Sequence, residues 1–321
     1  MADPKASLEL VGADHEHTLA LAGVCDGVAI DYRTLPVMEL FKRMIDERAY
    51  EACEFSLSNY IGLKARGADW LTAIPVFPNR SFRHNTLYVR RDSDLTDPSQ
   101  LRNRKLGVQE FSMTAAVWVR GFLLEQYGVH WRDIEWYCEA KHRRVAPPAG
   151  ARVTEVSTDL ESMLVASELD AIMSFGPQDE KLPAGQRKLR RLLADPEQVE
   201  KAYYRDTGIY PINHCVVIRN DVIERIPRIT EILFKAYARS KAAAYQRRIG
   251  ATMIPWGKQY WTETLELFGG DPLPYGLTET NRKVVGKLIG YLHEQKLISR
   301  APAVDELFVK GSADYREHTN G

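Results

Sequence analysis

Short apolar runs rich in β-branched residues alternate with helix-period segments along the whole chain. This alternation is typical of an α/β fold with largely parallel sheets. The first expected strands are Leu8–Val11 and Val28–Tyr32, and an amphipathic helix is expected over Pro36–Arg48. Cys53–Ser56 follows as a short strand that leads into a helix beginning near Ser58. The pattern therefore predicts a βα series at the start of the chain.

A second βα series begins in mid-chain, where Lys105–Gln109 is an expected strand and Met113–Tyr127 an expected helix. It continues through the strands Ile134–Cys138 and Ala171–Ser174, with a helix near Asp159–Ser167 between them. After a strand over Cys215–Ile218, everything beyond Arg228 is expected to be helical, notably Ile229–Arg247, Lys258–Phe268 and Glu279–Gln295. Because single cores stop growing at roughly 250–300 residues, a chain of 321 residues is expected to form two domains.

Two segments that flank the middle series resemble each other: Asn85–Asp92 reads NTLYVRRD and His214–Asp221 reads HCVVIRND. If both are crossover strands that join two lobes, the first lobe is discontinuous. Lobe 1 then comprises residues 1–88 and 217–321, lobe 2 comprises residues 89–216, and a ligand cleft lies between the lobes. Chance similarity of two short strands is the alternative.

Charge and composition exclude several classes of function. The 43 basic and 43 acidic side chains balance, so there is no electrostatic case for binding nucleic acid or an anionic membrane. No apolar run approaches the roughly 20 residues that span a bilayer, and the first residues do not form a secretion signal. The cysteines Cys25, Cys53, Cys138 and Cys215 form no CxxC pair. We therefore expect reduced, mostly buried thiols in a cytoplasmic protein.

The densest polar cluster is residues 75–84, where Arg80, Arg83 and His84 lie beside Phe77 and Phe82. Arginine suits bidentate capture of carboxylates, and a neighbouring aromatic ring can stack on a planar ligand. A solvated loop is the alternative. Its place directly before an expected crossover strand favours a role in ligand binding.

Two strand-to-helix junctions have the composition of anion sites. The first carries Ser56, Ser58 and Asn59, and the second carries Glu110, Ser112 and Thr114. Hydroxyls and free backbone N–H groups at a helix N-terminus bind carboxylate or phosphate, and ligands of open α/β sheets bind at strand carboxyl ends. The alternative is simple N-capping by Ser58 and Ser112.

Among the histidines, His15 and His17 form an HxH pair in the sequence Asp14-His15-Glu16-His17. With no third ligand assignable by spacing, we expect a surface or cleft-edge loop there and no metal site. His214 opens the second expected crossover and is the better candidate. The sequence contains no GxGxxG after a strand, no GxxxxGK[ST], no GxSxG and no HExxH, so dinucleotide, P-loop, hydrolase and zincin functions have no motif in their favour.

Three blocks of the sequence, residues 54–60, 73–89 and 107–121, resemble the signature blocks of 4,5-dihydroxyphthalate decarboxylases. The resemblance extends from about residue 8 to the final helices. That family is similar in fold to the periplasmic solute-binding proteins, so the resemblance implies a two-lobed α/β fold of their type II. It also implies cofactor-independent loss of one carboxylate from 4,5-dihydroxyphthalate, giving protocatechuate and carbon dioxide.

The implied reaction asks the site to clamp carboxylates, to polarise or deprotonate a phenol, and to hold a proton donor over the ring. The expected substrate-binding residues are Arg80, Arg83, Ser56, Ser58, Asn59, Phe77, Thr114 and Arg120, where Arg120 is the substitute if another arginine is structural. The expected catalytic residues are His84 as first choice of proton donor, His214 as second choice, and Glu110 as partner of a phenol hydroxyl.

A solute-binding protein for an aromatic dicarboxylate is the alternative function. The lack of an export signal favours the enzyme, because a transport receptor must be exported. An effector-binding domain is disfavoured, because the sequence has no basic helix-turn-helix segment. On either of the first two readings the expected partner is a small aromatic dicarboxylate, and homo-oligomer formation stays open.

Overall fold

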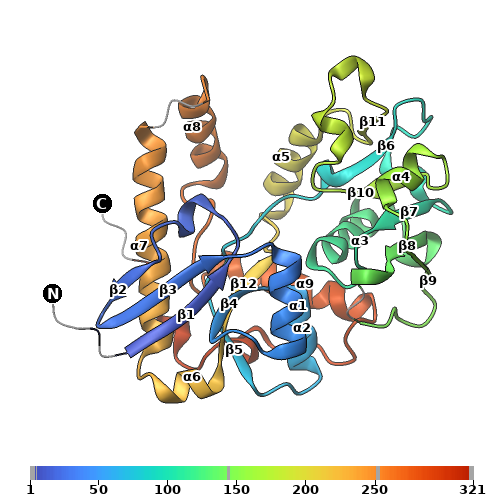
Figure 1. Ribbon diagram of the computed structural model, residues 1–321. Coiled ribbons are helices and arrows are strands. Elements are labelled where there is room, and N and C mark those ends of the chain that lie inside the picture. The colour runs from blue at the N-terminus through green and yellow to red at the C-terminus, as the bar shows by residue number, and fades with distance from the viewer. Residues whose placement is uncertain (1–3, 5, 143–144, 251–253, 318–321) are drawn as a thin grey trace. The chain divides into compact units, whose positions relative to one another are not determined.

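The computed structural model describes residues 4, 6–142, 145–250 and 254–317, and its chain divides into two compact units (Figure 1). Unit 1 comprises residues 1–80, 212–286 and 302–321, and unit 2 comprises residues 81–211 and 287–301. In the described residues, each unit is built on one six-stranded sheet.

The sheet of unit 1 has the strand order β2-β3-β1-β4-β12-β5. Its strands are β1 (Ala6–Gly12), β2 (Gly23–Cys25), β3 (Val28–Thr34), β4 (Ala52–Ser56), β5 (Leu71–Ile74) and β12 (His214–Arg219). β1 pairs parallel with β3 and β4, whereas β12 pairs antiparallel with both β4 and β5. The expectation of largely parallel sheets is therefore wrong for this sheet, which is mixed. β12 runs in the opposite direction because the chain returns to unit 1 at residue 212, at the end of the sheet where β4 and β5 finish.

Helices cover both faces of this sheet, with α7 on one side and α1 and α2 on the other (Figure 1). The helices of unit 1 are α1 (Val37–Glu47), α2 (Leu57–Ala65), α6 (Asn220–Arg225), α7 (Ile229–Gly250) and α8 (Gly257–Phe268). Val216 and Ile218 of β12 pack in the same core cluster as Leu233 and Tyr237 of α7. Alternate strand residues point to opposite faces, and each fully buried aliphatic side chain stabilises the fold by about 1.5–3 kcal/mol.

The sheet of unit 2 has the strand order β11-β6-β10-β7-β8-β9. Its strands are β6 (Leu87–Arg90), β7 (Lys105–Val108), β8 (Glu135–Glu139), β9 (Arg152–Val156), β10 (Ala171–Met173) and β11 (Leu189–Arg191). β10, β7, β8 and β9 are parallel neighbours, and β6 runs antiparallel to β10 and β11. This sheet is also mixed.

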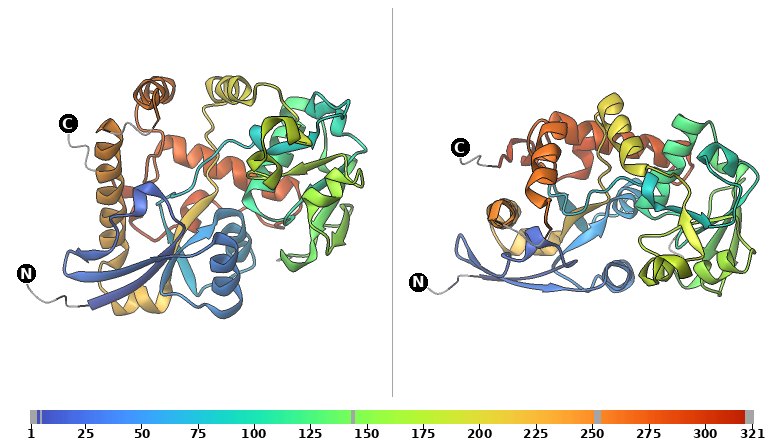
Figure 2. Two further views of the ribbon diagram at one scale, coloured as in Figure 1. Left: turned by 45° about the horizontal axis from the view of Figure 1, so that its top comes forward. Right: turned by 90° about the horizontal axis from the view of Figure 1, so that it is seen from above.

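The helices of unit 2 pack on both faces of its sheet, with α3 and α4 on opposite sides (Figure 2). They are α3 (Thr114–Tyr127), α4 (Leu160–Val165), α5 (Pro196–Thr207) and the later part of α9 (Glu279–Glu294). Ala171 and Met173 of β10 join the core cluster of α3, whereas Ile172 joins that of α4. This alternation follows from the two-residue period of a strand.

Every helix and strand named in the sequence analysis is present to within three residues at its ends, but short elements were missed. The missed elements are β2, β5, β9, β11, α5 and α6. β11 reads Leu-Arg-Arg, and β9 contains β-branched residues but also two charged side chains, so neither shows a continuous apolar run of the kind that identified the other strands. The expectation that everything beyond Arg228 is helical is wrong for residues 269–278, which are irregular, and after Glu294, where the chain is irregular with short 3₁₀ turns.

The boundaries of the units differ from the expected lobes in one instructive place. Residues 287–301 belong to unit 2, although lobe 1 was expected to take everything from residue 217. Tyr291 explains the difference, because its ring lies 2.2 Å from where a Cβ on Gly121 of α3 would stand. Gln295 adds a hydrogen bond to Arg120 of the same helix.

The two similar segments lie in different sheets, β6 in unit 2 and β12 in unit 1. Both strands end in an Arg-x-Asp ion pair, Arg90 with Asp92 at 3.0 Å and Arg219 with Asp221. The chain passes between units at residues 80–81 and 211–212, shortly before each strand. In the described residues, no helix combines the length and apolar character needed to cross a membrane.

Candidate functional site

One edge of each sheet collects polar side chains at the carboxyl ends of its parallel strands, where open α/β sheets bind ligands. In unit 1, β1, β4 and β5 end at this edge and the antiparallel β12 begins there. His15 follows β1, Ser56 ends β4, Arg80 follows β5, and His214 starts β12. Residues from four separate segments are thus brought to one edge.

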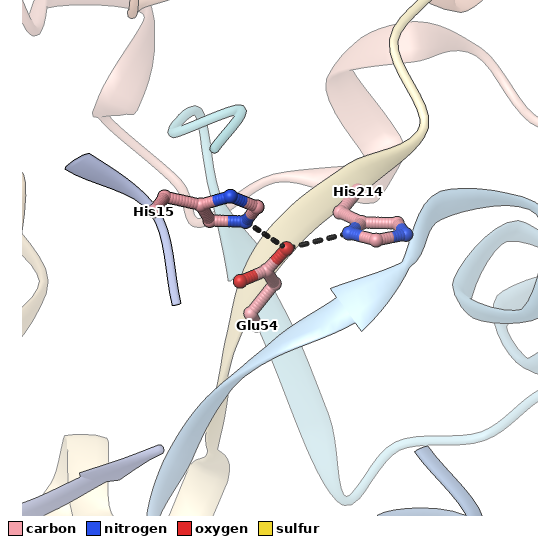
Figure 3. A group of neighbouring side chains, drawn as sticks. All are labelled: His15, Glu54 and His214. Carbon is pink, nitrogen blue, oxygen red and sulfur yellow. Dashed lines mark hydrogen bonds and ion pairs between the residues drawn. The ribbon is translucent and has the colours of Figure 1, made fainter. Parts of the chain in front are cut away.

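At the centre of this edge, the carboxylate of Glu54 lies between two imidazoles (Figure 3). Glu54 Oε1 lies 2.9 Å from His15 Nε2 and 2.5 Å from His214 Nδ1. The other oxygen, Oε2, accepts from the backbone N–H of Ala13 at 2.9 Å. Glu54 is buried, whereas His15 and His214 retain 17% and 14% of their side-chain surface.

Strand register produces this arrangement. β12 pairs with β4 so that His214 stands opposite Ser56 and Val216 stands opposite Glu54, which makes His214 and Glu54 diagonal neighbours. β1 pairs with β4 through Val11 and Cys53, so the loop that follows β1 begins beside Glu54.

Tyr32 fixes the start of that loop, since its hydroxyl donates to Ala13 O at 2.9 Å. A Cβ on Gly12 would lie only 2.7 Å from the Tyr32 hydroxyl oxygen. A side chain at this position would therefore have to shift the tyrosine ring that holds the loop.

Charge distribution makes Glu54 an ionised acceptor. Burial raises the pKa of the Glu54 carboxyl, but the hydrogen bonds and charges of His15 and His214 outweigh burial and hold that pKa well below its ordinary value. Burial lowers the pKa of His15, but the hydrogen bond and charge of Glu54, with a contribution from Asp14, raise it above its ordinary value. Because an ionised carboxylate only accepts, both imidazoles donate an N–H to Glu54.

His17 lies next to this cluster, with its ring stacked on that of His15 at 5.3 Å between centroids. Burial and the neighbouring His15 lower the pKa of His17 to about 4. It is therefore neutral near pH 7. Its Nε2 is buried and makes no hydrogen bond to the described residues.

His15 Nε2, Glu54 and His214 Nδ1 present ligand atoms within 4.8 Å of one another, a spacing from which a metal ion can be held. Two histidines with one glutamate form a known catalytic zinc set. Spacing in the sequence revealed no third ligand for His15 because the three residues are far apart in the chain. Glu54 is 39 residues from His15 and 160 residues from His214.

The junction at the start of α2 is capped by Ser56, whose Oγ accepts from Asn59 N at 3.4 Å. Capping by Ser58 was the expected alternative and is wrong, because Ser58 lies inside the helix with its Oγ 3.3 Å from Ser56 Oγ. Ser112 is also not a cap. It donates to Glu110 Oε1 through its N–H at 2.8 Å and its hydroxyl at 2.7 Å, while Met113 holds the N-cap position of α3.

Arg80, in unit 1, is buried and directs Nη2 at Pro274 O, 3.0 Å away, and at Asn281 Oδ1. Its guanidinium lies 5.5 Å from the ring centre of Phe77, which is also buried. The structure thus brings Arg80 and Phe77 together, as the sequence cluster indicated.

In unit 2, Arg83 and His84 precede β6 and reach the corresponding edge of the second sheet. His84 is enclosed: its Nε2 lies 2.6 Å from Gln126 Oε1 and its ring stacks on Phe122 at 4.3 Å. Burial lowers the pKa of His84, and the hydrogen bond to Gln126 opposes this only in part. Its Nδ1 is buried with no hydrogen-bond partner in the described residues.

Arg83 lies with its guanidinium 4.9 Å from the ring centre of Phe175, which follows β10 and is more than half exposed. Burial lowers the pKa of Arg83 to about 10, so the side chain stays cationic at neutral pH. A cation packed on an exposed aromatic ring suits the capture of an aromatic anion.

Arg120 and Thr114 both belong to α3 and are buried. Arg120 Nε donates to Gln295 Oε1 and its Nη2 to Phe111 O, both at 2.7 Å. The guanidinium also lies 4.0 Å from the ring centre of Phe111. Burial lowers the pKa of Arg120 to about 9.

The predicted residues are therefore divided between the units. Unit 1 holds Ser56, Ser58, Asn59, Phe77, Arg80 and His214, and unit 2 holds Arg83, His84, Glu110, Thr114 and Arg120. Sequence reasoning missed Glu54 and His15 as members of the site. One signal was available for Glu54, since it is the only charged residue in the short apolar strand Ala-Cys-Glu-Phe-Ser.

Comparison with solved structures defines the class of fold. The chain is similar to the periplasmic aliphatic sulphonate-binding protein SsuA of Escherichia coli (TM-score 0.59, 13% identity, covering 95% of this chain and 92% of the other). It is equally similar to the alkanesulfonate-binding SsuA of Xanthomonas axonopodis pv. citri (0.59, 16%, 96% and 99%) and similar to the desulfurization enzyme DSZB bound to biphenyl-2-sulfinic acid (0.55, 13%, 96% and 98%). This is the α/β fold of the periplasmic solute-binding proteins, as expected.

No protein-family model matches the chain. Among curated proteins, the chain is 31% identical over 303 residues to 4,5-dihydroxyphthalate decarboxylase of Comamonas testosteroni, covering 90% of this chain and 91% of the relative. It is 34% identical over 190 residues to 4,5-dihydroxyphthalate decarboxylase of Pseudomonas putida, covering 56% and 73%. The chain belongs to the 4,5-dihydroxyphthalate decarboxylase family, whose members are carbon–carbon lyases.

Proposed function

We propose that this protein removes one carboxylate from 4,5-dihydroxyphthalate, without oxidation and without a cofactor, and releases protocatechuate and carbon dioxide. The supporting observation is the contact of the buried Glu54 carboxylate with His15 and His214, at the carboxyl ends of the parallel strands in a chain related to decarboxylases over nine-tenths of its length.

The substrate supplies much of the driving force. Its hydroxyl para to the departing carboxylate donates electrons to the ring, so the ipso carbon accepts a proton and the intermediate is stabilised as a protonated dienone. The carbon–carboxylate bond then breaks, its electron pair restores aromaticity, and carbon dioxide leaves. The protein must therefore hold the dianion and place a proton donor at the ipso carbon.

The geometry favours His214 over His84 as that donor, which reverses the order expected from the sequence. The carboxylate of Glu54 accepts the N–H of His214 Nδ1 and so orients the ring, and part of the His214 side chain is accessible. His84 is enclosed by Phe122 and Gln126, and its pKa is lowered. Glu110 is a weaker candidate because the backbone N–H and the hydroxyl of Ser112 both donate to its carboxylate.

The carboxylates of the substrate are the proposed ligands of the two cluster arginines. Arg80 and Arg83 carry buried guanidinium groups beside Phe77 and Phe175. The further substrate-binding residues in this proposal are Ser56, Ser58 and Asn59 at the start of α2 and Thr114 at the start of α3. The positive end of the helix dipole at a helix start favours an anion.

The test is to mix the purified protein with 4,5-dihydroxyphthalate and follow substrate loss and carbon dioxide release. We expect wild-type turnover, with kcat lowered roughly 10²–10⁴-fold in His214→Asn, the usual contribution of general acid catalysis. His84→Asn should keep kcat within about tenfold, since it removes no donor. Full activity of His214→Asn together with loss in His84→Asn would return the donor role to His84.

A solute-binding protein for an aromatic dicarboxylate is the second candidate, and the similarity to sulphonate-binding proteins favours it. Tight binding of 4,5-dihydroxyphthalate by calorimetry, with no carbon dioxide released over hours, would support this candidate against the enzyme. The proposed enzyme is cytoplasmic, and it is compatible with either a monomer or a homo-oligomer. Cell fractionation and light scattering test these two points.

A further inference from the structure

The loop that follows β10 presents an aromatic side chain to solvent. Phe175 lies two residues beyond the end of β10 and is 54% exposed. In the part of unit 2 that the structure describes, it is the one aromatic residue among the strongly exposed apolar side chains. Single exposed apolar residues are common on protein surfaces, so exposure alone assigns Phe175 no role. Its place in the sheet and its contact with Arg83 distinguish it from such a residue.

Phe175 lies where the sheet of unit 2 reverses its strand order (Figure 1). From β7 the chain passes through α3 to β8 on one side, whereas from β9 it passes through α4 to β10 on the other side of β7. β7 and β10 are parallel, so their carboxyl ends lie at the same edge. Open α/β sheets bind ligands beyond the carboxyl ends of the strands at such a switch point. Phe175 is therefore at the position where this kind of sheet binds a ligand.

The loop that carries Phe175 is held in place on both sides. Ser174 donates its N–H to the chain just before β6 at 2.9 Å. The carboxylate of Glu161 in α4 accepts the N–H groups of Gln178 and Asp179, both at 2.8 Å. Gly176 permits the turn between these anchors, because its φ of 121° lies in the region that favours glycine. The exposed ring is thus fixed before a ligand arrives, which lowers the entropy cost of binding.

Arg83 places a positive charge over the ring of Phe175. The guanidinium carbon lies 4.9 Å from the ring centre, and the arginine is buried whereas the phenylalanine is exposed. The face of an aromatic ring is the negative part of its quadrupole, so a phenylalanine by itself would repel an aromatic anion stacked on it. A guanidinium within about 6 Å of the ring centre offsets that repulsion. The pair therefore combines apolar contact with attraction for an anionic ring.

Phe77, the aromatic residue expected from the sequence to meet the substrate, is less suited to this role. It is fully buried in unit 1, with its ring edge-on to that of Phe308 at 5.9 Å between centroids. Its other charged neighbour is Arg80, whose guanidinium lies 5.5 Å from the ring centre. Phe77 therefore packs behind Arg80, whereas Phe175 offers ring surface to a ligand.

We propose that Phe175, backed by the charge of Arg83, is the residue that selects an aromatic ring and makes the site specific for aromatic over saturated dicarboxylates. This inference rests on the proposed decarboxylase function and deepens it. The proposed reaction needs an aromatic ring to receive the proton, and a carboxylate clamp alone cannot distinguish a planar ring from a saturated one.

The test measures binding without turnover. Phthalate and cis-cyclohexane-1,2-dicarboxylate carry the same pair of adjacent carboxylates, but only phthalate has an aromatic ring, and neither has the hydroxyl that drives decarboxylation. We expect wild type to bind phthalate more tightly than the saturated analogue. Phe175→Leu should weaken phthalate binding roughly 3–10-fold and leave the saturated analogue within about twofold. Phe175→Tyr keeps a ring and should retain the preference. Isothermal titration calorimetry gives both dissociation constants.

Tyr260→Leu is the matched control, because Tyr260 in α8 of unit 1 is an aromatic residue of similar exposure, 55%. It should change neither dissociation constant. The ratio of the two constants is measured on one preparation, so a general loss of folded protein would affect both ligands alike.

The proposal is wrong if wild type binds phthalate no more tightly than the saturated analogue, if it binds neither, or if Phe175→Leu keeps the wild-type ratio. Failure of the proposed function is a separate result, because wild type would then release no carbon dioxide from 4,5-dihydroxyphthalate. The ratio of dissociation constants would still decide the role of Phe175 in that case.

Discussion

His214 Nδ1 lies 2.5 Å from Glu54 Oε1, although 160 residues separate them in the chain. The contact exists because β12 returns antiparallel beside β4 after the chain has formed most of unit 2. The position of the proposed proton donor thus requires the correct return of the chain to the first sheet, and a register shift of one residue would turn His214 to the opposite face.

Arg120 is expected to be structural, in spite of its place among the arginines proposed for the substrate. Arg120→Lys loses the paired bonds to Gln295 and Phe111, because an ammonium cannot reproduce the guanidinium fork. We expect the free energy of unfolding to fall by about 2–4 kcal/mol, with KM unchanged in the folded variant. Urea denaturation and steady-state kinetics measure both. The control Arg152→Lys alters an exposed ion pair and should shift stability by less than about 1 kcal/mol. A raised KM with normal stability would place Arg120 in substrate binding.

Gly121→Ala should overpack the contact between α3 and α9. The added Cβ would lie 2.2 Å from the Tyr291 ring, so a buried ring must move, and we expect a loss of about 1–3 kcal/mol or more. Gly290→Ala is the matched control, because a Cβ there meets nothing within 4 Å. It should be neutral or stabilising by up to about 1 kcal/mol. Thermal melts of the two variants decide the matter, and equal melting temperatures would contradict the packing described for unit 2.

Glu200 should make the protein less stable as pH rises. Burial raises the pKa of its carboxyl to about 7, above the roughly 4.5 of an exposed glutamate. The folded state thus favours the protonated form, and stability present in acid is lost between about pH 4.5 and 7.

Glu200→Gln removes this titration while keeping an oxygen for the N–H of Asn85. At pH 8 we expect the variant to exceed wild type by about 1–3 kcal/mol, and at pH 4 to match it. Glu197→Gln on the same helix, an exposed glutamate, is the control. Urea denaturation at both pH values is the measurement, and parallel pH slopes for Glu200→Gln and wild type would refute the assignment.

Dialysis against a strong chelator should leave decarboxylation unchanged, because the para hydroxyl of the substrate stabilises the intermediate and the proposed proton donor is a histidine. The assay compares dialysed with untreated enzyme, each with and without added divalent ions. Activity lost on dialysis and restored by one ion would identify His15, Glu54 and His214 as ligands and would remove His214 as the proton donor.

The sequence predicted much of the fold because its longer elements carry local signals. α1 is strongly amphipathic, α7 contains no proline, and β12 holds the apolar run Cys215–Ile218. Antiparallel pairing of β12 was not predictable, since direction depends on how the chain re-enters the sheet and periodicity does not record it.

The site was predicted only in part for a similar reason. Arg80, Arg83 and His84 were found because they are adjacent in sequence, but adjacency did not reveal that His84 is enclosed by Phe122 and Gln126. Glu54 and His15 were missed because their place in the site depends on His214, which is distant in the sequence. A charged side chain in an apolar strand was the sole local sign of a partner elsewhere.

The assignment of residues 287–301 to unit 2 has a consequence for genetic exchange. A recombinant fragment covering residues 81–211 would lack Tyr291 and Gln295, so α3 would present Gly121 and Arg120 to water. Such a fragment should aggregate or stay unfolded unless a peptide carrying residues 287–301 is supplied in trans. Transfer of unit 2 into another gene by recombination is therefore disfavoured, because its two separate segments would both have to be inserted.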